Sequence, residues 1–231
     1  MILDVIGPII IGPSSSHTAG MVRLGRTFRY LFNHSFSKGE SLKRVEFYLN
    51  KPLFSSYKGH GTDRALVGGV LGYFESQEEI RSSIEIASSL GLDIVFYCKS
   101  FENSHPNMVM ISGNSDSEAH YLIGASTGGA SIEILEIDGA PMNISGTFPT
   151  LIIKNSDTPG ALSKIVGAIS MKKLNISNMF LVRTNRLKGE ATCIVELDDV
   201  PEGELISLLE KLEPVLSVSY LPPITTAIGV T

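Results

Sequence analysis

Phe148-Pro-Thr-Leu-Ile-Ile-Lys154, followed directly by Asn155-Ser-Asp-Thr-Pro-Gly160, is the stretch that decides the fold of the last third of the chain. The first seven residues are mostly apolar and β-branched, which predicts a strand. Asp157 or Thr158 can cap a helix and Pro159 suits a first helical turn, so a helix is expected next. Its buried side would carry the apolar residues that recur at helical spacing, Leu162, Ile165, Val166 and Ile169.

Downstream of this helix, the apolar pattern predicts three more strands and one more helix. The strands are expected at residues 176–184, 191–197 and 215–221. Asn185-Arg-Leu-Lys-Gly189 is typical of a hairpin loop, and Pro201 opens the second helix. The order β-α-β-β-α-β is the ferredoxin-like arrangement. We therefore predict a domain at residues 148–224.

Upstream, residues 1–145 predict a mixed α/β domain of the α+β class with mainly antiparallel strands. Helices are expected at residues 18–32, at 62–74, and after a capping box at Ser76-Gln-Glu-Glu79. Strands are expected at residues 44–49, 93–99, 108–112, 118–125 and 132–137. The turn-rich stretch Asp138-Gly-Ala-Pro-Met-Asn-Ile-Ser-Gly146 is interpreted as a linker at residues 138–147.

The composition limits the class of protein. The 231 residues are 43% hydrophobic with a formal net charge of −5, which is globular and argues against a nucleic-acid surface. No apolar run approaches the roughly 20 residues that a membrane helix needs, and no basic start precedes the apolar N-terminus, so neither a membrane span nor a signal peptide is expected. Arg23, Arg26 and Arg29 lie three apart and predict a solvated basic edge on the first helix.

The two cysteines of the chain, Cys98 and Cys193, both lie in apolar strand-like runs and are expected to be buried thiols. Two cysteines in a chain of this length form no disulfide framework, so a cytoplasmic location is expected. An iron–sulfur cluster is usually held by three or four cysteine thiolates, so this chain cannot hold one alone. The sequence also lacks HExxH, paired CxxC, GxxxxGK[ST] and GxGxxG motifs, so no metal site is predicted in this chain.

Three short polar loops each carry a histidine. The serine loop is Gly12-Pro-Ser-Ser-Ser-His-Thr18, the GHGTD loop is Gly59-His-Gly-Thr-Asp63, and the HPN loop is Ser104-His-Pro-Asn107. The serine loop precedes a helix start, where free N–H groups and hydroxyls suit an anion such as a carboxylate. Each loop also has a plainer interpretation: an N-cap serine in a turn, a helix cap at Thr62 or Asp63, and an ordinary turn between strands.

Taken together, these loops resemble a known family. Asp4-Val-Ile-Gly-Pro8, the serine loop extended to Gly20, Gly59-His-Gly-Thr-Asp-Arg-Ala-Leu-Val-Gly-Gly69 and His105-Pro-Asn107 resemble the β subunit of iron–sulfur-dependent L-serine dehydratase (L-serine ammonia-lyase). Asp157-Thr-Pro-Gly-Ala-Leu162 with Asn175-Ile-Ser177 resembles an ACT domain, a module that binds free amino acids in many enzymes. The resemblance runs from residue 2 to about 221.

The resemblance implies a fold, a partner and a reaction. The N-terminal domain is similar to the allosteric substrate-binding domain of some 3-phosphoglycerate dehydrogenases. A separate α chain would carry the [4Fe–4S] cluster, whose exposed iron acts on the hydroxyl of L-serine while a base removes the α proton. The products are pyruvate and ammonia. The alternative is a non-catalytic regulatory subunit that binds an amino acid.

The resemblance also implies roles for residues. Ser14, Ser15, Ser16 and Thr18 would meet the serine carboxylate. His17, His60 and His105 would supply acid–base groups, and Asp63 and Asn107 would orient substrate or histidine. In the ACT domain, the effector loop would comprise Asn155, Asp157, Thr158 and Gly160. The alternative for this loop is that it only caps a helix, in a module used only for dimerisation. Self-association is expected through the ACT domain or through the N-terminal domain.

Overall fold

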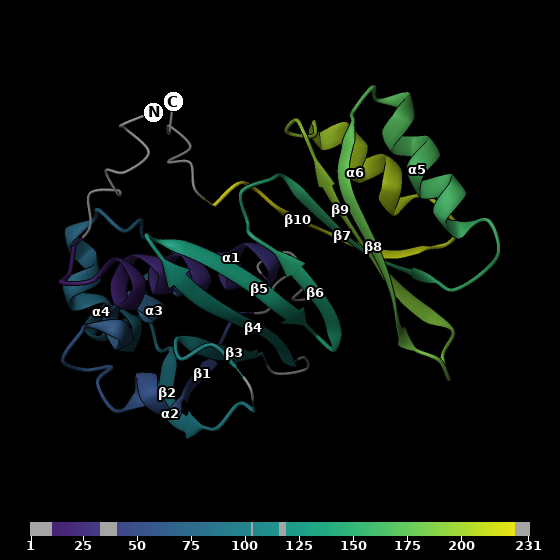
Figure 1. The fold of residues 1–231 in the computed structure, drawn as a ribbon. Helices are drawn as coiled ribbons and strands as arrows, with labels where there is room; N and C mark the ends of the chain where they lie inside the picture. Colours follow the sequence, from purple (N-terminus) through teal and green to yellow (C-terminus); the bar gives the residue numbers. More distant parts are fainter. Residues whose placement is uncertain (1–10, 33–40, 103, 116–118, 225–231) are drawn as a thin grey trace. The chain divides into compact units, whose positions relative to one another are not determined.

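The computed structural model describes residues 11–32, 41–102, 104–115 and 119–224. The Asp4–Pro8 motif and residue 118, where a strand was expected to begin, lie outside these ranges. The chain divides into two compact units (Figure 1). The described part of the first comprises residues 11–32, 41–102, 104–115, 119–138 and 143–145, and that of the second comprises residues 139–142 and 146–224.

The first six strands of the chain form one sheet, with the strand order β2-β1-β3-β4-β5-β6. Its strands are β1 (Arg44–Asn50), β2 (Asp93–Lys99), β3 (Met108–Asn114), β4 (Ala119–Gly128), β5 (Ser131–Ile137) and β6 (Ala140–Ile144). β1 and β2 are parallel, whereas β1–β3, β3–β4 and β4–β5 are antiparallel. The predicted mainly antiparallel α+β architecture is therefore confirmed for this sheet.

The helical elements of the first unit are the π-helical turn η2 (Ser15–Ala19), α1 (Gly20–Phe32), α2 (Lys51–Phe54), α3 (Thr62–Leu71), the 3-10 turn η3 (Glu78–Ser82) and α4 (Ser83–Ser89). Helices α1, α2 and α4 and the turn η2 contact the strands of this sheet, and α3 packs against α1 and α4. Figure 1 shows α1, in purple, running behind β4 and β5, which it contacts. The buried side of β1 alternates as predicted, with Val45, Phe47 and Leu49 inaccessible to solvent.

Two glycines bring helices α1 and α3 into backbone contact. A Cβ atom at Gly25 would overlap with the carbonyl oxygen of Leu66, and one at Gly69 would overlap with the carbonyl oxygen of Val22. Gly72, with φ at +97°, ends α3 three residues before the predicted end, because its left-handed conformation cannot continue a helix. The close contact holds the starts of both helices, and therefore the serine and GHGTD loops, in one neighbourhood.

The predicted basic edge of α1 is wrong. Arg23 and Arg26 are buried, and both guanidinium groups pair with the buried carboxylate of Glu75, at 2.5 Å from Arg23 Nε and 3.3 Å from Arg26 Nη1. Arg26 also lies 3.8 Å from the centre of the Phe74 ring. Arg29 donates to the carbonyl of Val70. Residue spacing alone did not reveal these partners, because they lie about 50 positions away in the sequence.

The predicted linker contains a strand. Asp138 and Gly139 both have positive φ, at +47° and +80°, and they turn β5 into β6. An Asp-Gly pair between two apolar runs is a strong hairpin signal, so the sequence carried this information. The interpretation of residues 140–144 as linker was wrong, because they form β6, although the division between the two units does lie within residues 138–147.

The second unit has the predicted β-α-β-β-α-β order. It comprises β7 (Thr150–Ser156), α5 (Ala161–Met171), β8 (Ile176–Asn185), β9 (Glu190–Leu197), α6 (Gly203–Glu210) and β10 (Val215–Leu221), with the sheet order β10-β7-β9-β8. All three strand pairs are antiparallel. The ferredoxin-like fold of this unit is confirmed.

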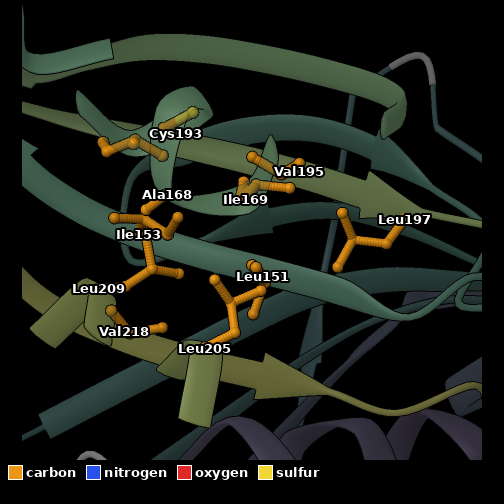
Figure 2. Close-up of a cluster of buried hydrophobic side chains, with 11 residues drawn as sticks. Leu151, Ile153, Ala168, Ile169, Cys193, Val195, Leu197, Leu205, Leu209 and Val218 are labelled. Atoms are coloured by element: carbon orange, nitrogen blue, oxygen red, sulfur yellow. The ribbon is translucent and has the colours of Figure 1, made fainter. Parts of the chain in front are cut away.

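Its core is formed by apolar side chains from three of its strands and from both helices. Figure 2 shows Leu151, Val195 and Leu205 among the clustered residues. Gly160, in the left-handed region with φ at +87°, precedes α5, so the helix begins after Pro159 rather than with it.

The two thiols differ in exposure. Cys193 lies within the second core, and burial raises the pKa of its thiol to about 11. Cys98 is exposed, so the prediction that both thiols are buried was wrong for this one. β2 is an edge strand, and its last three residues are exposed. No helix in the described part of the chain is both long and apolar enough to cross a membrane.

Candidate functional site

The serine loop folds around the imidazole of His17. The Ser14 hydroxyl accepts a hydrogen bond from the His17 backbone N–H at 3.1 Å, and it also lies 3.1 Å from His17 Nδ1. The Ser16 hydroxyl lies 3.4 Å from the same Nδ1 atom. Ser14 and Ser16 therefore orient the ring. The carbonyl of Ser15 accepts from the N–H of Gly20.

The imidazoles of His17 and His60 are stacked. Their ring centres lie 4.7 Å apart, with an angle of 25° between the planes. Two threonine hydroxyls hold the loops in this position: Thr18 donates to the carbonyl of His60 at 3.2 Å, and Thr62 donates to the carbonyl of His17 at 2.9 Å. Both threonines are buried. These reciprocal hydrogen bonds join two segments that are more than 40 residues apart in the sequence.

The stack favours a neutral imidazole at position 17. Burial lowers the pKa of His17 below its ordinary value of 6.5, and the neighbouring charge of His60 lowers it further. Near neutral pH this ring therefore has an unprotonated nitrogen, which is the form that can accept a proton.

The hydrogen bond of His60 determines its tautomer. His60 Nδ1 lies 3.2 Å from the carbonyl oxygen of Ser56, which can only accept a hydrogen bond. Nδ1 therefore carries the proton, and in the neutral ring Nε2 has the free electron pair. The segment Phe54–His60 lines a surface cavity of about 380 Å³. The neutral His60 ring therefore has a basic nitrogen, Nε2, and the residue borders a cavity.

The HPN loop is held against strand β4. The Asn107 side chain donates to the carbonyl of Ser126 at 3.4 Å, and the N–H of Ser126 donates to the carbonyl of Asn107 at 3.2 Å. Ser126 in turn packs against Gly20, where a Cβ atom would overlap with the serine side chain. The third loop therefore lies beside the start of α1, just after the serine loop.

His105 has the opposite tautomer to His60. Its Nδ1 accepts a hydrogen bond from the Asn107 N–H at 3.1 Å, so Nε2 carries the proton in the neutral ring. In the described ranges, no ring contact or hydrogen bond links His105 to His17 or His60. The structure thus brings two of the three predicted imidazoles together and places the third on a neighbouring loop.

Asp63 lies in the first turn of α3, where its carboxylate accepts from the N–H of Arg64 at 2.9 Å. No contact between this carboxylate and an imidazole occurs within the part of the chain that the structure describes. The cap interpretation of Asp63 accounts for this geometry, because a carboxylate near a helix N-terminus is favourable.

The predicted effector loop of the second unit begins with a buried amide. Asn155 donates to the carbonyl of Ser156 at 2.8 Å, but no described group donates to its buried Oδ1 atom. Asp157 pairs with Arg183 at 2.6 Å. The carbonyls of Thr158 and Gly160 accept from the N–H groups of Ala161 and Lys164 in the first turns of α5.

Sequence reasoning missed two residues of the site. Thr62 was considered only as a helix cap, although its position two residues after His60 could have indicated a hydroxyl facing the other loop. Ser126, the partner of Asn107, lies in β4 just after the predicted end of this strand at residue 125, and it carries no sequence signal of a site. Across the described ranges, no group of three or more His, Cys, Asp or Glu side chains is arranged to hold a metal ion.

Comparison with known proteins assigns these loops to a family. Residues 2–132 match the family described as "Serine dehydratase beta chain". The chain belongs to this family. It is 33% identical over 220 residues to the "Probable L-serine dehydratase, beta chain" of Bacillus subtilis (strain 168), covering 95% of this chain and 97% of that protein. It is 31% identical to the "L-serine dehydratase, beta chain" of Peptoniphilus asaccharolyticus, covering 94% and 96% of the two chains.

Two weaker similarities lie outside this family. A D-3-phosphoglycerate dehydrogenase of Methanocaldococcus jannaschii is 24% identical over 136 residues, which is 59% of this chain and 25% of that protein. Among solved structures, the ACT domain from GTP pyrophosphokinase of Chlorobium tepidum is 27% identical and covers 32% of this chain and 96% of that chain, with a TM-score of 0.27.

Proposed function

We propose that this serine dehydratase β chain works in an iron–sulfur L-serine ammonia-lyase that converts L-serine to pyruvate and ammonia. Membership of the family and two relatives named as L-serine dehydratase β chains support the reaction class. The observation that carries a direct role for this chain is the stacked pair of His17, oriented by serine hydroxyls, and His60, which is held by the Ser56 carbonyl and lines a cavity.

His60 is the proposed base for the α proton of the substrate. Its Nδ1 proton is engaged by the Ser56 carbonyl, so Nε2 is the nitrogen that can accept a proton. His17 shares this environment as a neutral ring, and His105 carries its proton on Nε2 and can donate. Loss of the β hydroxyl after proton removal yields an enamine, which tautomerises to an imine and hydrolyses to pyruvate and ammonia.

Ser15 is the proposed contact for the substrate carboxylate. Of the three serines, Ser14 and Ser16 lie against His17, whereas the Ser15 hydroxyl has no hydrogen-bond partner in the described part of the structure. Thr18, initially expected at the carboxylate, is buried with its hydroxyl bonded to His60, so its proposed role is to position the imidazole. Asn107 is proposed to orient the HPN loop through Ser126.

The [4Fe–4S] cluster is proposed to reside on a partner α chain. The thiols of this chain do not fit a cluster, because the sequence has two cysteines and Cys193 is buried within an apolar core with its pKa raised. A cluster needs three or four thiolates in one place. The contribution of this chain is therefore confined to binding, orientation and proton transfer.

The second unit is proposed to be a regulatory ACT module. Its fold has the required β-α-β-β-α-β order, and the unpaired Oδ1 of Asn155 lies at the end of β7, where the chain turns toward α5. A buried amide oxygen without a donor is costly, and the amino group of an amino acid would satisfy it. An amino-acid effector is therefore proposed at the loop from Asn155 to Gly160.

The test is co-expression with the cluster-bearing chain under anaerobic conditions, followed by a pyruvate-formation assay. His60→Gln is expected to lower kcat by about 10²–10⁴-fold, the range of a general base. The matched control is His120→Gln, since His120 pairs with Asp138 away from the stack. Survival of kcat in His60→Gln with a changed apparent affinity for serine would instead favour the alternative, a non-catalytic subunit that binds an amino acid.

A further inference from the structure

A second surface cavity, of about 350 Å³, lies beside the histidine loops. Its wall is contributed by the serine loop at residues 11–13 and at Thr18, by the GHGTD loop, by the first turn of α3, and by η3. His17 and His60 do not line it, whereas His60 does line the cavity at Phe54–His60. Lys58 and Gly59 border both cavities, so this short segment forms a wall between them.

The charged side chains that line this cavity are all cationic. They are Lys58, Arg64 and Arg81, each of them exposed. Arg81 is neutralised by Glu78 at 2.8 Å. Within the described ranges, neither Lys58 nor Arg64 has a carboxylate partner. The Asp63 carboxylate next to Arg64 is bonded to a backbone N–H instead. In a chain with a net charge of −5, the lining of this cavity therefore carries two cations without a carboxylate partner.

The backbone of this cavity adds to the positive potential. Helix α3 has ten residues and begins at Thr62, and the Asp63 carboxylate in its first turn accepts from the Arg64 N–H. Arg64 therefore projects from the helix end that carries a partial positive charge. The Asp63 carboxylate offsets part of the potential of the helix end but does not line the cavity, so the charges that face the cavity are the two cations without a carboxylate partner.

We infer that this cavity binds a small anion with two negative charges, either a phosphate ester or a dicarboxylate. A dianion matches the two unpaired cations, whereas L-serine, with no net charge, does not. Thr18 and Gly61 line the cavity and also belong to the two segments that the threonine hydrogen bonds join. The bound anion therefore braces the loops that hold the imidazoles, which makes this a regulatory or structural site separate from the proposed substrate site.

The test measures binding to the full-length chain by calorimetry at constant ionic strength, with inorganic phosphate, malonate and acetate as probes. Phosphate or malonate is expected to bind, and acetate to bind at least about tenfold more weakly. Arg64→Gln is expected to weaken dianion binding by about 10–100-fold, which corresponds to losing one charge-assisted hydrogen bond. The matched control is Arg186→Gln, which removes an exposed arginine from the hairpin loop of the second unit.

The possible outcomes show whether the site exists and, if it does, which class of anion it binds. Binding of phosphate alone indicates a phosphate ester, and binding of malonate alone indicates a dicarboxylate. Equal affinity in Arg64→Gln and the unmodified chain, equal weakening in Arg186→Gln, or no binding of either dianion overturns the inference. Lys58→Gln provides a second variant if Arg64→Gln loses its circular dichroism. Because this assay needs no partner chain and no turnover, its failure is distinct from failure of the proposed reaction.

Discussion

At the scale of single residues, the site depends on hydrogen bonds that fix the place of two rings and the protonated nitrogen of one of them, His60. The carbonyl of Ser56 assigns a proton to His60 Nδ1, and the serine loop surrounds His17. The sequence predicted the histidine-bearing loops, because unusual clusters of Ser, His, Gly and Asn are visible without a structure. It did not predict the threonine contacts, because the partners lie far apart along the chain.

Replacing Thr62 with Val tests the contact between the two loops. The variant keeps the shape of the side chain but removes the hydrogen bond to the His17 carbonyl. We expect the free energy of unfolding to fall by about 0.5–1.5 kcal/mol, as for a typical intramolecular hydrogen bond. We also expect the pKa of His17 to rise toward its ordinary value, measured by NMR titration of the imidazole, because a looser stack lets water reach the ring.

The control for Thr62→Val is Thr27→Val. Thr27 is also buried, and its hydroxyl bonds to the carbonyl of Arg23 within the same helix. A similar loss of stability is expected there, with the His17 titration unchanged. An equal effect of the two variants on His17 would show that Thr62 has no special influence on the ring.

The lowered pKa of His17 predicts a pH dependence of stability. In the unfolded chain this imidazole takes up a proton near its ordinary pKa of 6.5, whereas the folded chain keeps it neutral to lower pH. Below 6.5 the unfolded state therefore binds more protons, and stability falls as pH falls. The stability due to neutral His17 is fully present above that value.

Denaturant unfolding at about pH 7.5 and about pH 5.5 checks this dependence, since these values bracket the ordinary histidine pKa. The unmodified chain is expected to lose more stability on acidification than His17→Asn does. Identical losses in the two proteins would mean that His17 does not contribute to the pH dependence.

At the scale of secondary-structure elements, strands were easier to predict than the ends of helices. Strands β2 and β10 have the predicted bounds, because apolar runs mark strands directly. Helix α3 ends earlier than predicted, and β6 was interpreted as linker, because glycines at positive φ decide both features. Whether a glycine adopts positive φ or lies within a helix depends on packing, as the contrast between Gly72 and Gly69 shows.

The contact of α1 with α3 gives a prediction at this scale. Gly69→Ala would place a methyl group against the backbone of Val22 and Gly25, which cannot rotate away. We expect the free energy of unfolding to fall by about 1–3 kcal/mol, as for overpacked cores, in a urea titration.

The control for Gly69→Ala is Gly167→Ala. This exposed glycine lies inside helix α5 with no neighbour within 4 Å of the added methyl group. That variant is expected to raise the free energy of unfolding by about 0.5–1 kcal/mol, since alanine favours helix over glycine. If both variants changed the free energy of unfolding in the same direction, the argument that Gly69 is required by the close contact of α1 with α3 would be refuted.

At the scale of the whole molecule, two units carry two separate cores. The sequence predicted the fold of the second unit well, since every element of it has a local apolar pattern and most of its turns are short. It predicted the order of elements in the first unit less completely. The buried Arg23–Arg26–Glu75 cluster of that unit depends on long-range pairing that no local pattern encodes.

The two thiols provide a probe of this organisation. Ellman's reagent is expected to modify Cys98 rapidly in the native chain, because it is exposed. Cys193 should react only when denaturant opens the second core, since the thiol is buried and its pKa of about 11 disfavours the reactive thiolate. The Cys98→Ser variant should show no rapid phase. Two rapidly reacting thiols in native protein would contradict the described core.

The glycine contact between α1 and α3 also has a genetic consequence. Where side chains fill an interface, a damaging enlargement on one helix can be rescued by a smaller residue on the other. At Gly25 and Gly69 no such rescue exists, because each already faces main-chain atoms and has nothing left to remove. A search for second-site suppressors of Gly69→Ala should therefore recover reversion to glycine or global stabilisers elsewhere, and no compensating replacement on α1.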